Sequence, residues 1–317
     1  TDQFMAKKLG LIVLVLILAG IAALIWTFSA ARLEFTPLEA AELPPAMPPA
    51  GMTLSSLPTG SMESRALFAY RGGGLSDKRD FAMTAFLVRH PKGDLLFDTG
   101  FGFDVDEHIK TTPWLMRQLS VHTRTKTVAN LFGGSGYLPS QLAGVVLTHA
   151  HWDHVSGLDS LPGVKVWVTP AEKRFIDSRD ATTALINSFK DITYREYNFT
   201  DGPYLGFEKS FDVWSDGSVV IVPAPGHTPG SIVAFSALPT GARYALLGDL
   251  VWQMEGVDIP AERPWLSRQL VDENGDEVRR QIAKIAAIRK RFPEIHMVPA
   301  HDARAASRVP MFPATAK

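Results

Sequence analysis

The chain has 317 residues, of which 46% are hydrophobic, and its formal net charge is −1 at pH 7. This length suits one large folded domain with an appendage, and a pI near 6.7 argues against an electrostatic grip on nucleic acid. No cysteine is present, which excludes disulfides, thiolate metal ligands and a cysteine nucleophile.

The first segment, residues 1–31, contains an uncharged apolar run, Leu9–Phe28, that is long enough to cross a bilayer as a helix. Lys7 and Lys8 precede the run, so the positive-inside tendency places the N-terminus in the cytoplasm. We therefore expect a membrane anchor with the remaining chain on the extracytoplasmic side, periplasmic or extracellular. A cleaved signal peptide is the alternative, because residues 27–31 offer small side chains to a peptidase.

The second segment, residues 32–60, is rich in proline. Proline fixes φ and disfavours helix, which predicts an extended, semi-rigid linker. Such a linker either holds the following domain off the membrane or lies along the domain surface as an arm. The folded domain is expected over residues 61–317.

The start of this domain reads as three strands, at 65–71, 81–90 and 94–98, with glycine-containing turns between them. From residue 101 to 137 the pattern is irregular and rich in bulky side chains.

A short apolar run at 142–147 predicts a buried strand and leads into Thr148-His149-Ala150-His151-Trp152-Asp153-His154. Three imidazoles and a carboxylate packed so closely on a strand-end loop indicate a metal site. A histidine-rich surface loop is the alternative, and it would not need completing by donors from elsewhere.

Three further donors each follow an apolar run. His227 lies in a Gly/Pro turn after 219–222, Asp249 follows a run at 245–247, and His301 follows 295–298. Singly, each has an ordinary explanation as a turn or capping residue. Together they are the arrangement expected when several strands deliver ligands to one rim, and they supply enough donors for two metal ions.

Other elements are expected around these donors. Residues 164–168 predict a strand, 170–177 a short helix beginning with proline, and 277–292 an amphipathic helix. A hairpin is expected around Asp216-Gly217. No element is assigned to residues 181–204.

The combined pattern, His-x-His-x-Asp-His, then Gly-His-Thr-Pro-Gly-Ser, then Gly-Asp and a last histidine, resembles the metallo-β-lactamase superfamily. The resemblance implies an α/β fold, a four-layer αβ/βα sandwich with its site at one edge, here preceded by the transmembrane helix. It implies two zinc ions, with manganese or iron as alternatives. One ion would be held by His149, His151 and His227, the second by Asp153, His154 and His301, and Asp249 would bridge both. Asp98, in Asp-Thr-Gly, matches a family residue that orients the metal-binding histidines without binding the metal itself.

The same resemblance implies a hydrolase in which a metal-bridging hydroxide attacks a small ester, lactone or related acyl or phosphoester substrate. Asp153 and Asp249 would be its catalytic carboxylates. The spacing is similar to that of the lactonase and organophosphate-hydrolase branch, although Trp252 stands where acyl-homoserine lactonases often carry a tyrosine. A glyoxalase II-like thioesterase and a mononuclear-iron persulfide dioxygenase of the same fold are the alternatives.

The substrate is expected to be a small molecule, and the membrane is the other expected partner. Bulky residues near the site are candidates for the wall of its pocket. These are Phe101, Phe103, Trp114, Trp152 and Trp252.

Overall fold

Two β-sheets packed face to face form the centre of the molecule. The structure is a computed structural model that describes residues 2–39, 42–119 and 121–317. Thr1, Ala40, Ala41 and Ser120, which fall within the predicted anchor, linker and domain, lie outside the described residues.

The first sheet has seven strands in the order β4-β1-β2-β3-β5-β6-β7. In chain order these are β1 (Thr53–Arg65), β2 (Lys78–Arg89), β3 (Asp94–Phe97), β4 (Val121–Arg124), β5 (Leu142–Val146), β6 (Val166–Val168) and β7 (Tyr194–Glu196). Strands β1, β2 and β3 pair antiparallel, whereas β3, β5, β6 and β7 run parallel. Parallel strands end at the same edge, so the segments that follow β3 and β5 meet there.

The second sheet has five strands in the order β12-β11-β10-β9-β8. They are β8 (Phe211–Asp212), β9 (Val219–Pro223), β10 (Ile232–Ala237), β11 (Arg243–Gly248) and β12 (Ile295–Pro299). Strands β11 and β12 are parallel, which brings the ends of both to one edge.

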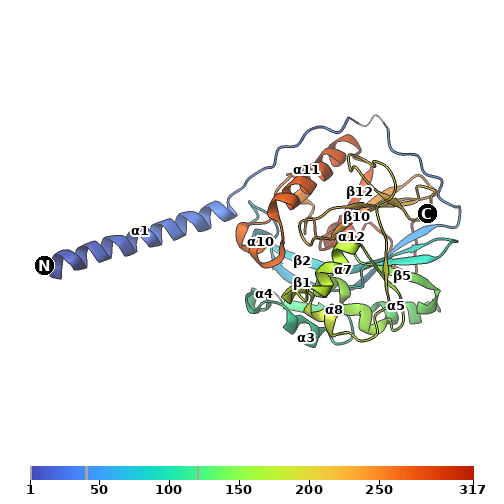
Figure 1. Ribbon diagram of the computed structural model, residues 1–317, viewed down its shortest axis with the longest axis horizontal. Coiled ribbons are helices and arrows are strands. Elements are labelled where there is room, and N and C mark those ends of the chain that lie inside the picture. Colours follow the sequence, from blue (N-terminus) through green and yellow to red (C-terminus); the bar gives the residue numbers. More distant parts are fainter. Residues whose placement is uncertain (1, 40–41, 120) are drawn as a thin grey trace.

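Helices cover the outer face of each sheet (Figure 1). After α1, the helices are α2 (Ala66–Ala69), α3 (Val105–His108), α4 (Trp114–Leu119), α5 (Val128–Gly133), α6 (Trp152–Val155), α7 (Pro170–Asp177), α8 (Ala184–Ser188), α9 (Glu255–Asp258), α10 (Trp265–Val271), α11 (Gly275–Arg291) and α12 (Ala303–Ala306). Helix α11 lies on the second sheet, and α3, α5 and α8 lie on the opposite side of the molecule.

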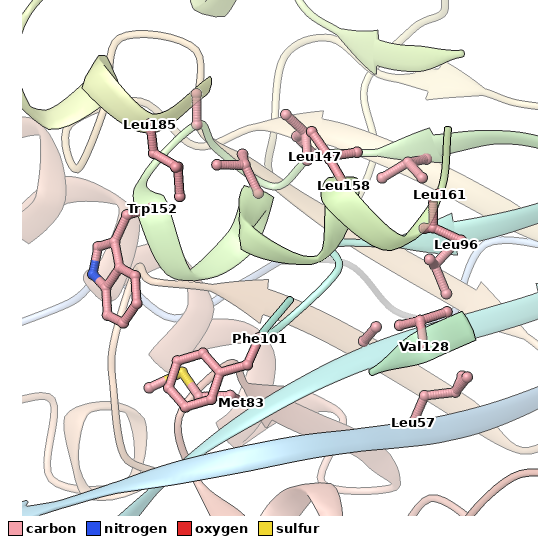
Figure 2. Packing of buried hydrophobic residues seen from close by; sticks show 14 of the residues in the cluster. Leu57, Met83, Leu96, Phe101, Val128, Leu147, Trp152, Leu158, Leu161 and Leu185 are labelled. Atoms are coloured by element: carbon pink, nitrogen blue, oxygen red, sulfur yellow. The ribbon is translucent and has the colours of Figure 1, made fainter. Parts of the chain in front are cut away.

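Three apolar clusters fill the spaces between four layers, namely the two sheets and the helices outside each of them. Phe97 and Val146 of the first sheet pack against Ile221 and Leu246 of the second, and so fill the space between the sheets. A second cluster joins the first sheet to α5, α6, α7 and α8 (Figure 2). A third joins the second sheet to α11. The fold is therefore the predicted αβ/βα sandwich.

The N-terminal helix α1 (Asp2–Phe28) projects away from the domain (Figure 1). It is long and apolar enough to cross a membrane, and its membrane-length segment is not buried against the domain. The segment after it returns to the domain: the Leu33 N–H donates to the Pro260 carbonyl at 2.7 Å, and Arg243 donates to the Pro44 carbonyl at 3.1 Å. Of the two arrangements open for the proline-rich segment, the structure shows the surface arm.

Two expectations at the start of the domain were wrong. Strand β1 begins at Thr53, inside the predicted linker, and Pro58 sits in it beside a register shift at Gly60, one of the places where a strand tolerates proline. The strand predicted at 65–71 is instead the end of β1 followed by α2. Its sequence, Ala-Leu-Phe-Ala, is free of β-branched residues and suits a helical turn.

The later elements agree closely with expectation. Helix α7 has the predicted bounds, and α11 covers the predicted amphipathic helix with Ile282 and Ile285 buried. Strands β8 and β9 pair antiparallel as the expected hairpin. The unassigned residues 181–204 contain the short helix α8 and the edge strand β7.

Candidate metal centre

Four strand ends bring the candidate ligands to one rim of the sandwich. Strand β5 leads into the loop with His149 and His151, and α6 carries the two ligands that follow. His227 lies in the turn between β9 and β10, Asp249 follows β11, and His301 follows β12. The turn before His227 needs glycine, because Gly226 has φ +130° and an added Cβ would meet Val278.

The structure brings all seven candidate ligands together. Their donor atoms form three overlapping groups, within each of which the atoms lie within 4.8 Å of one another. The groups are His149, His151 and His227, then His149, His154 and Asp249, and finally Asp153, His154 and His301.

The distances at the centre are short. His149 Nε2 and His227 Nε2 lie 3.1 Å apart, and His301 Nε2 lies 3.0 Å from Asp249 Oδ1. Asp153 Oδ2 lies 3.3 Å from His301 Nε2. All of these side chains except Asp153 are buried, and Asp153 is about nine-tenths covered.

Two atoms at the centre have no hydrogen-bond partner among the described residues. His154 Nε2 and Asp249 Oδ1 are buried and lie 3.1 Å apart, but their geometry is not that of a hydrogen bond. Buried polar atoms left unpaired are costly, and nitrogen and carboxylate oxygen are ligands that zinc prefers. The residues present therefore fit a divalent metal ion at this point.

The electrostatics agree with this interpretation. Burial, together with the neighbouring imidazoles, holds the pKa of His149 and of His151 well below the ordinary value, so both rings are neutral. Burial alone would raise the pKa of the Asp249 carboxyl, but the imidazoles of His301 and His154 hold it well below its usual range. Burial alone would lower the pKa of His154 and of His301, but the carboxylates around them raise both, so these two rings would release a proton when they bind a metal.

Asp98 lies directly behind this centre. Its Oδ2 accepts from His154 Nδ1 at 2.8 Å and from the Thr148 hydroxyl at 2.7 Å, and its Oδ1 accepts from the Thr148 N–H at 2.7 Å. Asp98 adopts φ +54°, a left-handed conformation that aspartate tolerates better than most residues. These bonds orient His154 so that its Nε2 faces the centre.

Two other histidines are oriented by groups that the sequence analysis did not identify. His227 Nδ1 lies 2.8 Å from Asp272 Oδ1, and Arg263 pairs with the same carboxylate. His301 Nδ1 donates to the Ala82 carbonyl at 2.9 Å. Histidine ligands commonly use their second nitrogen in this way.

Glu172, also not identified from the sequence, joins the two halves of the site. It is buried and accepts from the Ala150 N–H at 2.6 Å, the Thr228 hydroxyl at 2.7 Å and the Gly230 N–H at 3.0 Å. One carboxylate therefore fixes the first histidine loop against the His227 turn. Burial raises the pKa of Glu172 to about 7.

Trp252 has a polar contact that its aromatic character did not predict. Its indole N–H donates to Asp249 Oδ2 at 2.8 Å. The Phe81 ring and the Arg263 guanidinium pack against it, at 5.8 Å and 4.9 Å from the ring centroid. The indole is thus held in a fixed position beside the ligands.

A pocket of about 290 Å³ opens above the ligands. His151, Asp153, His227, Asp249 and His301 line one part of it. The remaining wall is mostly apolar and comes largely from β1, β2, α2, α10 and the segment leading into α4. It includes Met62, Phe68, Phe81, Met83, Met116 and Leu270. Of the described residues that line the pocket, none is a lysine or an arginine.

Two of the five predicted pocket aromatics line this pocket, namely Trp152 and Trp252. Phe101 does not. It is fully buried in the core beside Met83 and stacks on Trp152 at 5.5 Å (Figure 2). Phe103 and Trp114 are also outside the lining, and both are exposed, by 45% and 65%. The bulky side chains of residues 101–137 thus divide between the core, the surface and, with Met116, the pocket wall.

Comparison with known proteins agrees with the site and the fold. Residues 80–287 match the family described as the metallo-beta-lactamase superfamily. A probable metallo-hydrolase of Mycobacterium tuberculosis is 29% identical over 243 residues, which cover 68% of this chain and 73% of that protein.

Solved structures with the same fold include an N-acyl homoserine lactone hydrolase with N-hexanoyl-L-homoserine bound at its catalytic metal centre. It has a TM-score of 0.65 and 16% identity, and covers 83% of this chain and 98% of that one. Another is a dizinc quorum-quenching lactonase, with a TM-score of 0.55, 16% identity, and coverage of 86% and 92%.

Proposed function

The chain belongs to the metallo-β-lactamase superfamily and is a metal-dependent hydrolase, and we propose that it uses two zinc ions to cleave a small ester, lactone or related acyl or phosphoester bond. One observation carries this proposal: seven buried or nearly buried donors converge below an apolar pocket. The dizinc lactonase with the same fold supports the metal and its number.

The ligand groups divide naturally between two ions. His149, His151 and His227 would hold one, Asp153, His154 and His301 the other, and Asp249 lies between the two groups. When bound, such a pair of ions lowers the pKa of a water molecule and polarises the oxygen of the bond to be cleaved.

The protein's own residues supply the rest of the chemistry. Trp252 fixes the Asp249 carboxylate from the pocket side through its indole N–H. Asp153 lines the pocket, which supports a role in which its carboxylate takes up a proton from the attacking water and passes it to the leaving group. The apolar wall would bind the acyl part of the substrate and exclude water from the ligands.

The pocket favours an uncharged substrate. Away from the candidate metal ligands, the described lining is apolar or uncharged, and it offers no lysine or arginine to an anionic group. This disfavours a glutathione thioester, whose carboxylates need basic partners. Arg304, the basic candidate closest in sequence to His301, is instead paired with Glu255 and Asp302.

The proposal is tested by metal analysis and turnover on the purified full-length chain. We expect two zinc ions per chain, and faster cleavage of lactones and aryl esters with apolar acyl groups than of glutathione thioesters. One iron per chain together with oxidation of a glutathione persulfide would overturn it in favour of the dioxygenase. A preference for glutathione thioesters would favour the thioesterase.

Asp249→Asn provides the matching variant test. Loss of the charged carboxylate between the ion sites should remove one metal per chain and lower turnover at least 100-fold. Asp216→Asn is the control, because Asp216 also bonds a histidine, His90 at 3.1 Å, but outside the site. Wild-type turnover by Asp249→Asn would contradict the bridging role.

We further propose that α1 is a retained membrane anchor and that the catalytic domain lies on the extracytoplasmic side. The length of α1 supports the anchor, and Lys7 and Lys8 before the apolar run support the orientation.

A further inference from the structure

The C-terminal end of α1, here called its base, is held against the domain by several contacts. The Thr27 side chain is buried, and its hydroxyl accepts from the Trp265 N–H at 2.7 Å. Arg71 donates to the carbonyls of Trp26 and Ser29 at 2.8 Å and 3.1 Å, and its guanidinium lies over the Trp26 ring at 4.9 Å. The helix is therefore not a free tether.

The elements that hold α1 also build the pocket. Ser267 and Leu270 of α10 and Phe68 of α2 line it, and the Ser267 hydroxyl joins the two elements by donating to the Phe68 carbonyl at 2.9 Å. The Phe28 ring packs edge-on against Phe68 at 6.2 Å. The base of α1 and one wall of the pocket are thus a single packed unit.

The position of the bilayer follows from α1. A hydrocarbon core of about 30 Å takes up about 20 helical residues, which matches the apolar run ending at Phe28. Trp265 is bonded through its N–H to Thr27, so with α1 across the bilayer the start of α10 would lie at the level of the lipid headgroups.

The neighbouring surface carries two exposed tryptophans. Trp265 at the start of α10 is 50% exposed, and Trp114 at the start of α4 is 65% exposed. Both helices lie at the end of the domain from which α1 projects (Figure 1). Tryptophan is enriched at the boundary between lipid and water, where its ring is both apolar and a hydrogen-bond donor.

We propose that this end of the domain, formed by α2, α4 and α10 and here named the anchor face, rests on the bilayer surface and that the pocket opens onto it. The substrate is then an acyl ester or lactone that dissolves in lipid and enters the pocket from the bilayer. The nature of the cleaved bond rests on the proposed hydrolysis, whereas the membrane contact rests on the proposed retention of α1 as an anchor.

The surface arm supports this placement. Leu33 returns to the domain only a few residues after α1 ends, through its bond to Pro260. The connection between α1 and the domain is therefore too short for the domain to move away from the headgroups. The apolar pocket wall and the exposed tryptophans would then remain together at the membrane surface.

The absence of native cysteine permits a direct test. Single variants Trp265→Cys and Trp114→Cys, and the controls Leu138→Cys and Met311→Cys, would carry a nitroxide in the full-length protein in phosphatidylcholine/phosphatidylglycerol vesicles. Leu138 and Met311 are similarly exposed, by 60% and 58%, and lie in the segment between α5 and β5 and in the C-terminal segment after α12. Helix α5 and the C-terminus lie at the end of the domain away from α1 (Figure 1). We expect labels on the anchor face to collide more with oxygen than with an aqueous nickel complex, and the controls to show the reverse. Equal access of nickel to all four would overturn the proposal.

A kinetic test uses Trp265→Asp and Trp114→Asp, with Leu138→Asp as control. Both tryptophans are the first residue of a helix, where a carboxylate is well tolerated. Turnover of a long-chain ester embedded in vesicles should fall about tenfold in the first two, while turnover of a short soluble ester stays unchanged. Unchanged turnover of the embedded ester would overturn the proposal. If no ester were cleaved at all, the proposed function would fail, and the nitroxide result would still decide the membrane contact.

Discussion

Asp98 orients His154, although its own carboxylate does not face the candidate metal centre. Its carboxylate accepts from His154 and twice from Thr148, so it fixes both the ring and the loop that carries it. Loss of such an orienting partner typically costs about 10–100-fold in metal affinity or activity.

The variant Asp98→Asn tests this role. Asparagine tolerates the left-handed backbone at φ +54°, so the fold should persist, but the neutral amide is a poorer partner for His154. We expect a fall of about 10–100-fold in zinc affinity, measured by competition with a chelator. Asp216→Asn serves again as the control, and an unchanged affinity in Asp98→Asn would show that Asp98 only shapes the turn.

Trp252→Phe separates the polar role of the indole from its role as pocket wall. The phenyl ring keeps apolar contact, but the bond to Asp249 is lost. A hydrogen bond to a charged group contributes about 1.5 kcal/mol or more, which corresponds to about a tenfold fall in kcat.

In Trp252→Phe the KM for a short ester and the metal content should stay near their wild-type values. Trp265→Phe, outside the pocket lining, is the matched control. Loss of zinc from Trp252→Phe would mean that the indole is needed to hold the metal ligands in place. An unchanged kcat would show that the bond to Asp249 contributes nothing to turnover.

The sequence identified candidate ligands more readily than the groups behind them. His149 and its neighbours form a dense local motif, and His227, Asp249 and His301 each follow an apolar run. Asp272 carries no comparable signal, because it reaches His227 across 45 positions and the contact depends on tertiary packing, in which backbone bonds join Glu273 to His227 and Asn274 to Gly226.

Helix α9 is fastened to the sheet and to α12 by one carboxylate. Glu255 accepts from Arg79 of β2 at 2.9 Å and from Arg304 of α12 at 2.7 Å. Burial alone would raise the pKa of Glu255, but these guanidinium groups lower it from 4.5 to about 2. The contribution of Glu255 to stability is therefore present above pH 4.5 and is lost as the pH falls towards 2.

Glu255→Gln should lower the Tm of the metal-free protein by about 2–4 °C at pH 7. The difference from wild type should shrink as the pH falls below 4.5, because wild-type Glu255 then becomes protonated as well. Calorimetry in the presence of a chelator measures this. Glu107→Gln, which removes an exposed pair with Lys110, should leave Tm unchanged, and a pH-independent deficit in Glu255→Gln would contradict the electrostatic origin.

Among the helices and strands, too, those that depend on neighbouring residues were easier to predict than those that depend on contacts distant in the sequence. Helix α11 was predictable from its apolar periodicity, and strands β9, β11 and β12 from short apolar runs, because both signals are local. Strand β1 was partly missed because Pro58 suggested a linker, whereas the bulge that accommodates it depends on pairing with β2.

For the whole molecule, we expect α1 to be retained in the mature protein. Cleavage after any of residues 27–31 would remove some or all of the contacts that Trp26, Thr27 and Ser29 make with Arg71 and α10. Intact mass measurement of the protein from the membrane fraction should show the N-terminal segment. A mature N-terminus at or after residue 28 would identify it as a signal peptide.

With α1 across a membrane, as proposed, the segment between α1 and β1 would also determine how the protein searches for its substrate. Hydrogen bonds from this segment to Pro260, Arg243 and Asp216 hold the domain close to the base of α1, so the two would move through the membrane together. Encounters would then be governed by lateral diffusion in two dimensions, so turnover should follow the mole fraction of substrate in the leaflet rather than its bulk concentration.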